Sequence, residues 1–85
     1  MQNNIIIFYF LKGLIDMDIL KDFGKIVAEK RKAIGISQEE LAHKAELHRT
    51  YIGMVERGEK NITIKSIFKL SSALDCSIEE LVKGL

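Results

Sequence analysis

The chain has 85 residues, 47% hydrophobic and 29% charged, which suits one small globular domain and excludes a disordered chain. Its single cysteine, Cys76, excludes an internal disulfide and a cysteine-based zinc site, and it fits a reducing, cytoplasmic location. With a net charge of only +1, any binding of nucleic acid must depend on a local basic patch.

The first residues form a strongly apolar run at positions 5–11. This run is too short to span a bilayer and lacks the flanks of a signal peptide, so no membrane association is expected. A chain that began at Met17 would be a complete small domain. Residues 1–16 are therefore either an upstream extension of the reading frame or a real apolar arm that packs on the domain or on a partner. The predicted division is an apolar extension, 1–18, and a domain, 19–85.

Helical spacing of the apolar residues, with no proline in the chain, predicts an all-α fold of five helices. The first is expected over about 19–34 and is followed by Gly35, the residue type that favours a helix C-terminus. Its expected inward face repeats at three- and four-residue steps: Ile19, Leu20, Phe23, Ile26, Val27 and Ile34.

Three further helix starts can be read from capping signals. Ser37 with Glu40, and Ser77 with Glu80, are capping boxes that predict the starts of the second and fifth helices. Thr63 is a candidate cap for the fourth helix. The inward positions expected on the second and fourth helices are Leu41, Ala42, Ala45, Ile64, Ile67, Leu70 and Leu74.

The third helix is expected from about Arg49 to Arg57, after a short turn at 45–47. Two short helices joined by a turn of three or four residues have the geometry of a helix-turn-helix. In SQEELAHKAELHRTYIGMVERG the small Ala42 falls where the two helices cross. Three apolar residues, Leu47, Ile52 and Val55, hold the second helix of the motif inward, which leaves the outer face to Arg49, Thr50, Gly53 and Met54.

The stretch from about 26 to 81 resembles the lambda-repressor-like, Cro-type (XRE) family of DNA-binding domains. The resemblance rests on Arg31, SQEELA, TYI followed by VERG, and the closing LSSAL and SIEEL. Within that family, HRTYIGMVERGEKNITIKSI is most similar to the controller proteins of restriction–modification systems. The resemblance implies a compact five-helix domain in a dimeric transcription regulator that binds inverted repeats in double-stranded DNA. It also implies an ion pair between Arg31 and Glu56.

Base contacts are expected from the outer face of the third helix. Arg49 lies at its start, where a recognition helix presents its first residues to base edges. The arginine fork can donate two hydrogen bonds to guanine, worth ~1–3 kcal/mol of discrimination. Thr50 can contact a base or a phosphate, Met54 can contact a thymine methyl group, and Gly53 lets the backbone approach the DNA.

Phosphate contacts are expected around this face. Gln38 resembles the family glutamine that grips the DNA backbone, and the N–H groups at the start of its helix, next to Ser37, favour the same anion. His48 caps the third helix or touches a phosphate. Tyr51 is expected to pack while its hydroxyl touches a phosphate. The other expected phosphate contacts are Arg57, Lys60, Asn61 and Lys65.

Two residues depart from the family pattern. The family turn usually carries glycine or asparagine where this chain has Glu46, so a positive φ there would come at a cost. Gly53 stands where controller proteins tend to have serine. The preferred DNA sequence therefore cannot be copied from relatives.

A homodimer is expected because one recognition helix covers too few base pairs, and helix-turn-helix proteins place half-sites about one DNA turn apart. The surplus of apolar residues after Leu74 motivates the expected interface, which consists of Phe68, Ile78, Val82 and Leu85. Two alternatives stay open beside the regulator. One is an antitoxin of the same fold, and the other is an interaction module whose apolar N-terminus docks to a membrane or a larger protein.

No catalytic role is expected, since the sequence offers neither a serine–histidine–acid arrangement nor a glycine-rich phosphate loop. Glu39 and His43 have metal-ligand spacing, but no third ligand converges on them by spacing, so no metal is expected. No cofactor or small-molecule ligand is expected, because the chain has no room for an effector domain. Cys76 is interpreted as a buried small hydrophobe.

Overall fold

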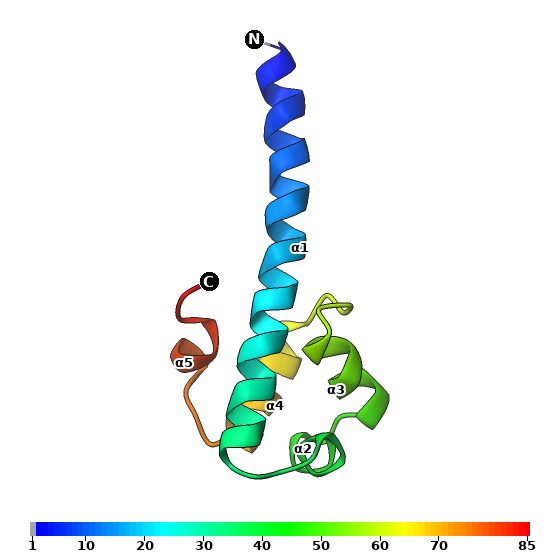
Figure 1. The fold of residues 1–85 in the computed structure, drawn as a ribbon, viewed down its shortest axis with the longest axis vertical. Helices are drawn as coiled ribbons and strands as arrows, with labels where there is room; N and C mark the ends of the chain where they lie inside the picture. Colours follow the sequence, from blue (N-terminus) through cyan, green and yellow to red (C-terminus); the bar gives the residue numbers. More distant parts are fainter. Residues whose placement is uncertain (1) are drawn as a thin grey trace.

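Helices alone build the part of the chain that the structure describes. The computed structural model describes the backbone of residues 2–85 and the side chains of residues 4–12 and 19–85. Helices α2 to α5 gather around the C-terminal half of α1 (Figure 1). Within these residues there are five helices and no strand: α1 (Gln2–Ala33), α2 (Gln38–Ala45), α3 (Arg49–Glu56), α4 (Ile64–Ala73) and α5 (Ile78–Val82). The predicted all-α class and the helix-turn-helix at α2–α3 are confirmed.

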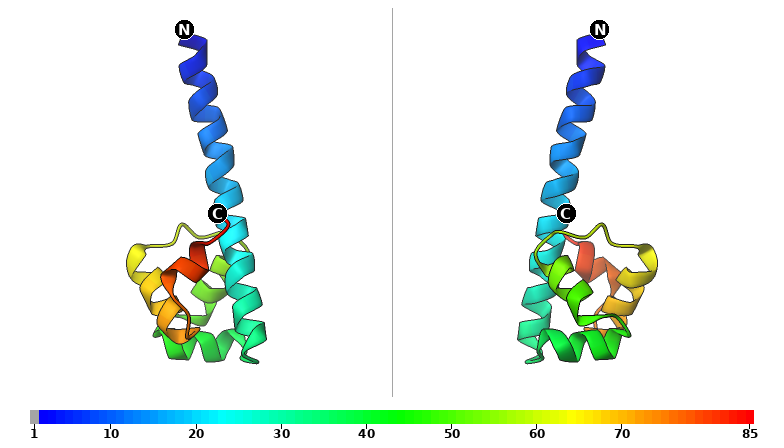
Figure 2. Two further views of the ribbon diagram at one scale, coloured as in Figure 1. Left: turned by 90° about the vertical axis from the view of Figure 1, so that its left-hand side faces the viewer. Right: turned by 90° about the vertical axis from the view of Figure 1, so that its right-hand side faces the viewer.

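Helix α1 begins at Gln2, so the prediction of a first helix starting near residue 19 was wrong. No proline precedes residue 19, and nothing in that segment forces a helix to stop. The N-terminal half of α1 projects away from the other helices in two side views (Figure 2). None of the described helices is long and apolar enough to cross a membrane.

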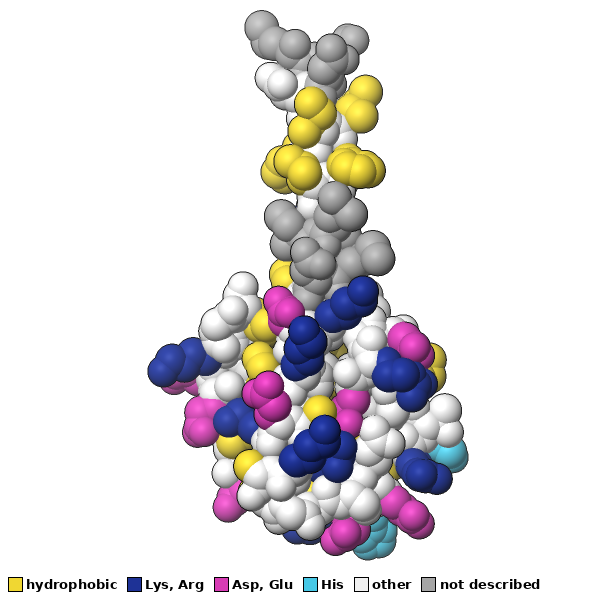
Figure 3. All heavy atoms as spheres, viewed as in Figure 1, with side chains coloured by type: hydrophobic (Ala, Val, Ile, Leu, Met, Phe, Trp, Pro, Cys, Tyr) yellow, Lys and Arg dark blue, Asp and Glu magenta, His cyan; other side chains and the backbone are white. Residues whose placement is uncertain are grey.

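The apolar arm does not pack on its own domain. Side chains at 5–11 are between 49% and 68% exposed. In the space-filling view they stand out on the projecting part of α1, well above the body of the molecule (Figure 3).

The core lies where the C-terminal half of α1 meets the other four helices. Three residues expected inside are exposed instead: Ile19, Ile34 and Ile64 are 38%, 45% and 74% exposed. Ile34 follows the last residue of α1 and Ile64 is the first residue of α4, so both lie at the ends of helices. The buried hydrophobic residues are Phe23, Val27, Leu41, Ala42, Ala45, Ile52, Val55, Leu70, Leu74 and Leu81.

Local hydrogen bonds set the helix boundaries. Ser37 Oγ accepts from the Glu40 N–H at 3.0 Å, and Glu40 Oε1 accepts from the Ser37 N–H at 3.3 Å, which completes the predicted capping box. The Ser77–Glu80 box and the Thr63 cap are also present. These caps satisfy backbone N–H groups that a helix leaves without an internal partner.

Glu46 reverses the chain between α2 and α3. It adopts the left-handed conformation, with φ 56° and ψ 42°. The Leu47 N–H then donates to the Ala42 carbonyl at 2.9 Å, so the turn closes on the end of α2. This conformation costs a residue with a Cβ about 1–2 kcal/mol.

Candidate nucleic-acid interface

Helix α3 is anchored on one side and open on the other. Ile52 and Val55 are 0% and 2% exposed, and α3 packs against both α1 and α2. Arg49 and Thr50, at the N-terminal end of the same helix, are exposed. Ile52 and Val55 are three positions apart and share the inward face, whereas Thr50, two positions before Ile52, points away from it. Arg49 is exposed at the first position of the helix.

Five residues from α2 and α3 line one open hollow of about 280 Å³. Along the axis of α3, positions 49, 53 and 57 succeed one another at four-residue steps, so they share a face. The start of α2 closes the hollow from the side. The lining residues are Gln38, Arg49, Thr50, Gly53 and Arg57. Met54 is partly buried and is not among them, so the hollow contains three of the four residues predicted to contact bases.

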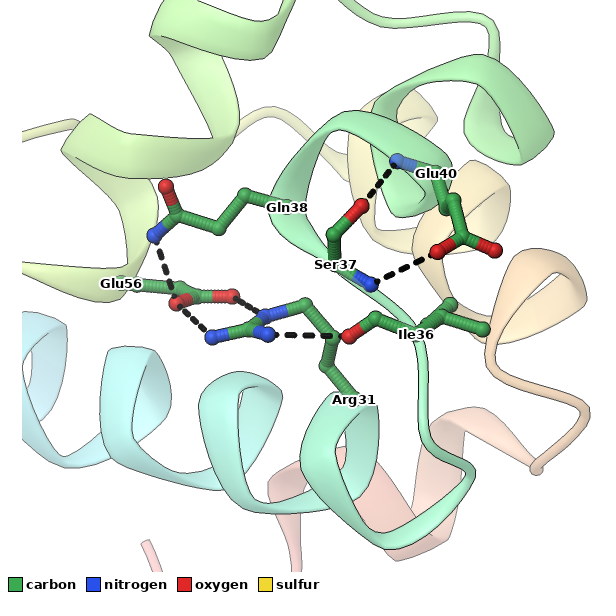
Figure 4. Close-up of polar contacts among 6 residues, drawn as sticks. All are labelled: Arg31, Ile36, Ser37, Gln38, Glu40 and Glu56. Atoms are coloured by element: carbon green, nitrogen blue, oxygen red, sulfur yellow. Dashed lines mark hydrogen bonds and ion pairs between the residues drawn. The ribbon is translucent and has the colours of Figure 1, made fainter.

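An ion pair between α1 and α3 lies beside Gln38, one of the residues that line the hollow (Figure 4). Arg31 donates from Nε to Glu56 Oε2 at 2.7 Å and from Nη2 to Glu56 Oε1 at 3.0 Å. The two side chains are only 12% and 7% exposed. The hydrogen bonds to Glu56 raise the pKa of the Arg31 guanidinium above its ordinary value. This is the pairing that the sequence resemblance implied, and it locks α3 to α1.

Gln38 belongs to the same network, which the sequence did not predict. Its Nε2 donates to Glu56 Oε1 at 2.9 Å. Arg31 also donates from Nη1 to the Ile36 carbonyl at 3.0 Å, just before α2 begins. Glu56 therefore holds the start of α2 and the end of α1 in register with the recognition helix.

Gly53 lines the hollow on the outer side of α3, but the side chain of Arg57 covers it. A Cβ built on Gly53 would lie 3.1 Å from Arg57 Nη1. Arg57 in turn donates from Nε to Glu59 Oε2 at 3.0 Å. The sequence did not predict this partner, although the two-residue spacing across a helix end could have suggested it.

The Tyr51 hydroxyl, predicted from the sequence to touch a phosphate, lies below the molecular surface. It is buried and has no hydrogen-bond partner within the described residues, which corrects the expectation of a surface hydroxyl. Lys60 lies above its ring, with Nζ 5.8 Å from the centroid. His48 caps α3, since its Nδ1 accepts from the Thr50 N–H at 3.2 Å. The other residues expected at phosphates are exposed on the surface: Ser37, Lys60, Asn61 and Lys65.

The HTH_3 helix-turn-helix family matches residues 27–81. The chain belongs to this family. Control protein C.SmaI from Serratia marcescens is 42% identical over 66 residues, which are 78% of this chain and 79% of that protein. Control protein C.BamHI from Bacillus amyloliquefaciens is 41% identical over 61 residues, 71% of this chain and 75% of that one.

A solved structure agrees with these relatives. The restriction-modification controller protein C.AhdI from Aeromonas hydrophila superposes with a TM-score of 0.75 at 45% identity, over 76% of this chain and 94% of that chain. As an HTH_3 protein with these relatives, the chain is a DNA-binding transcription regulator.

The described residues of the HTH_3 protein give little support for a metal-binding or other second site. Among the described residues, no three histidine, cysteine, aspartate or glutamate side chains gather into a group that could hold a metal ion. Glu39 and His43 are exposed on α2. Cys76 is only partly buried, which corrects the expectation of a fully buried side chain, and this burial raises the pKa of its thiol.

The residues predicted to form a dimer interface lie on α4, on α5 and at the C-terminus of the HTH_3 protein. Phe68, Val82 and Leu85 are 61%, 39% and 44% exposed, and Ile78 is partly buried. Large apolar side chains are therefore presented to solvent on helices other than the recognition helix.

Proposed function

We propose that this chain is a controller protein of a restriction–modification system and that it binds an inverted-repeat operator as a homodimer. One observation carries the proposal. Arg49 and Thr50 stand exposed at the leading end of a helix whose opposite face is fixed in the core. A recognition helix needs this combination, because its N-terminal residues must enter the major groove while the helix stays rigid.

Direct readout is assigned to the leading end of α3. Arg49 can donate two hydrogen bonds to the O6 and N7 atoms of guanine, and Thr50 can bond a base edge or contact a thymine methyl group. Met54 is partly buried, so it contributes at most one edge of its side chain.

Phosphate contacts are assigned to the groups that flank α3. The start of α2 presents backbone N–H groups beside Gln38. Lys60, Asn61 and Lys65 offer exposed donors in the loop after α3 and at the start of α4. Such contacts set the register of the protein on the duplex and carry no sequence information themselves.

The relatives support the controller assignment. Two curated relatives above 40% identity are named control proteins, and a solved relative at 45% identity is a restriction-modification controller protein. Each of these three matches spans at least three-quarters of the relative's own length. The homodimer rests on the exposed apolar side chains of α4, α5 and the C-terminus.

The decisive test is selection of bound fragments from a random duplex library, followed by titration of Arg49→Ala on the selected site and on a scrambled site. The wild type should select a motif with two related half-sites. Arg49→Ala should lose about 5- to 150-fold in affinity for the selected site and little for the scrambled one. Equal losses on the two sites would contradict the assignment of Arg49 to bases. Lys83→Ala, a change in the last turn of the chain, is the control for a simple loss of charge.

A further inference from the structure

The side chain of Arg57 lines the predicted base-reading hollow. It follows the last residue of α3, yet its guanidinium folds back over Gly53, one turn earlier. There it shares the hollow with Arg49 and Thr50. A Cβ on Gly53 would lie 3.1 Å from Arg57 Nη1, so a larger residue there would push the guanidinium outward by a few tenths of an ångström.

Glu59 determines which edge of the guanidinium remains available. It accepts the Arg57 Nε–H at 3.0 Å, while Nη1 and Nη2 have no hydrogen-bond partner within the described residues. These two nitrogens form one edge of the planar fork, and a planar fork suits bidentate bonding to guanine O6 and N7. A lysine ammonium in this place keeps the charge but not the fork.

We propose that Arg57 is a second base-reading residue, seated over Gly53 and oriented by Glu59. This rests on the proposed DNA-binding function and replaces the phosphate contact expected from the sequence. The guanidinium lies four residues along α3 from Arg49, which is about 6 Å at the helical rise. Arg49 and Arg57 are therefore placed to read different base pairs of one half-site.

The test is selection from a library of random duplexes with the full-length wild type, Arg49→Lys and Arg57→Lys. Lysine preserves the phosphate attraction, so a residue that only grips phosphates should tolerate the change. We expect Arg57→Lys to lose preference at one base pair by about 5- to 150-fold. Arg49→Lys should lose preference at a different base pair of the same half-site. Lys25→Arg, a swap of an exposed cation on α1 that has no assigned contact with DNA, is the control and should leave the motif unchanged.

The possible outcomes separate the two proposals. If the wild type selects no motif, the proposed function and this inference both fail. If the wild type selects a motif that Arg57→Lys keeps in full, only the inference fails. A uniform loss on every sequence with Arg57→Ala, together with a salt slope reduced by about one unit, would also assign Arg57 to a phosphate and overturn the inference.

Glu59→Ala tests the positioning role separately. Removal of the carboxylate takes a negative charge away from the DNA, so affinity for all duplexes should rise. Preference at the Arg57 base pair should nevertheless fall, because the guanidinium is no longer held over Gly53. A rise in affinity with an unchanged motif would overturn the role given to Glu59.

Discussion

Arg31 and Glu56 join the end of α1 to the end of the recognition helix through two hydrogen bonds, at 2.7 Å and 3.0 Å. Gln38 bonds to the same carboxylate, so one side chain connects three helices. A nearly buried ion pair of this kind adds little net stability compared with an apolar pair, but each partner depends on the other. The orientation of α3, and with it the direction of Arg49, therefore depends on Glu56.

The first prediction concerns this dependence. Glu56→Ala leaves the Arg31 charge and the Gln38 amide without their acceptor in a site that is almost closed to water. The free energy of unfolding should fall by about 3–5 kcal/mol, measured by urea denaturation. Glu59→Ala removes one partner of the exposed pair Arg57–Glu59. It should lower the free energy of unfolding by less than about 1 kcal/mol.

The double variant Arg31→Met, Glu56→Met provides the complementary control. Two apolar side chains of suitable volume need no counter-charge, so most of the lost stability should return. Equal losses in Glu56→Ala and Glu59→Ala would show that the pair is solvated and does not fix α3.

The second prediction concerns the left-handed residue in the turn. Glu46 sits at φ 56°, a conformation that glycine adopts without a Cβ penalty. Glu46→Gly should raise the free energy of unfolding by about 1 kcal/mol, equivalent to a Tm increase of about 4–8 °C for a domain of this size. Lys44→Gly, two positions earlier and inside α2, should lower stability by about 1 kcal/mol. A loss of stability in Glu46→Gly would refute the left-handed geometry.

Helix starts could be predicted from the sequence because capping depends on residues three positions apart. Ser37 with Glu40 and Ser77 with Glu80 both formed the expected boxes. The start of α1 could not be predicted in this way. No breaker or cap separates residues 1–18 from the rest, so the sequence pattern alone indicated only where the packed part of the helix lies.

Only those features of the site that follow from helical periodicity could be predicted from the sequence. Burial of Ile52 and Val55 follows from spacing, and so does the exposure of Thr50 on the other side of α3. The bond from Gln38 to Glu56 joins residues 18 positions apart, and the fold of Arg57 over Gly53 depends on a side-chain rotamer. Neither is encoded in the spacing of residue types along the chain.

The third prediction concerns pH. Glu80 accepts hydrogen bonds from the backbone and side chain of Ser77, which lowers its pKa below the ordinary value. The unfolded chain therefore binds a proton at this group more readily than the folded chain. Glu80 contributes stability above its unfolded pKa, and the contribution is lost as the pH falls through the folded pKa.

Glu80→Gln should accordingly show a shallower fall in stability on acidification, measured by urea denaturation from about pH 7 to pH 3. Glu79→Gln is the matched control, because the Glu79 side chain makes no hydrogen bond within the described residues. Identical pH profiles for the wild type and Glu80→Gln would exclude a coupling between the cap and stability.

The fourth prediction concerns the projecting part of α1. The described residues of α1 that lie in the core start at Phe23, and side chains 5–11 remain exposed. A chain without residues 1–16 should therefore keep its helical circular dichroism per residue in the domain and its affinity for the selected DNA. A large loss of DNA affinity with the fold intact would instead show that the apolar arm contributes to DNA binding.

The last prediction concerns dimerisation. Phe68 is 61% exposed on α4, so a charged residue there should leave the fold intact. If Phe68 lies in the dimer interface, Phe68→Glu must bury a charge without a partner, which favours the monomer. Sedimentation at micromolar concentration should show a shift from dimer to monomer.

Affinity for a duplex with two half-sites should fall much more than affinity for a single half-site, because only the first needs two copies bound together. Lys69→Glu, on the adjacent position of α4, controls for the added negative charge. A Phe68→Glu protein that remains dimeric would exclude this face as the interface.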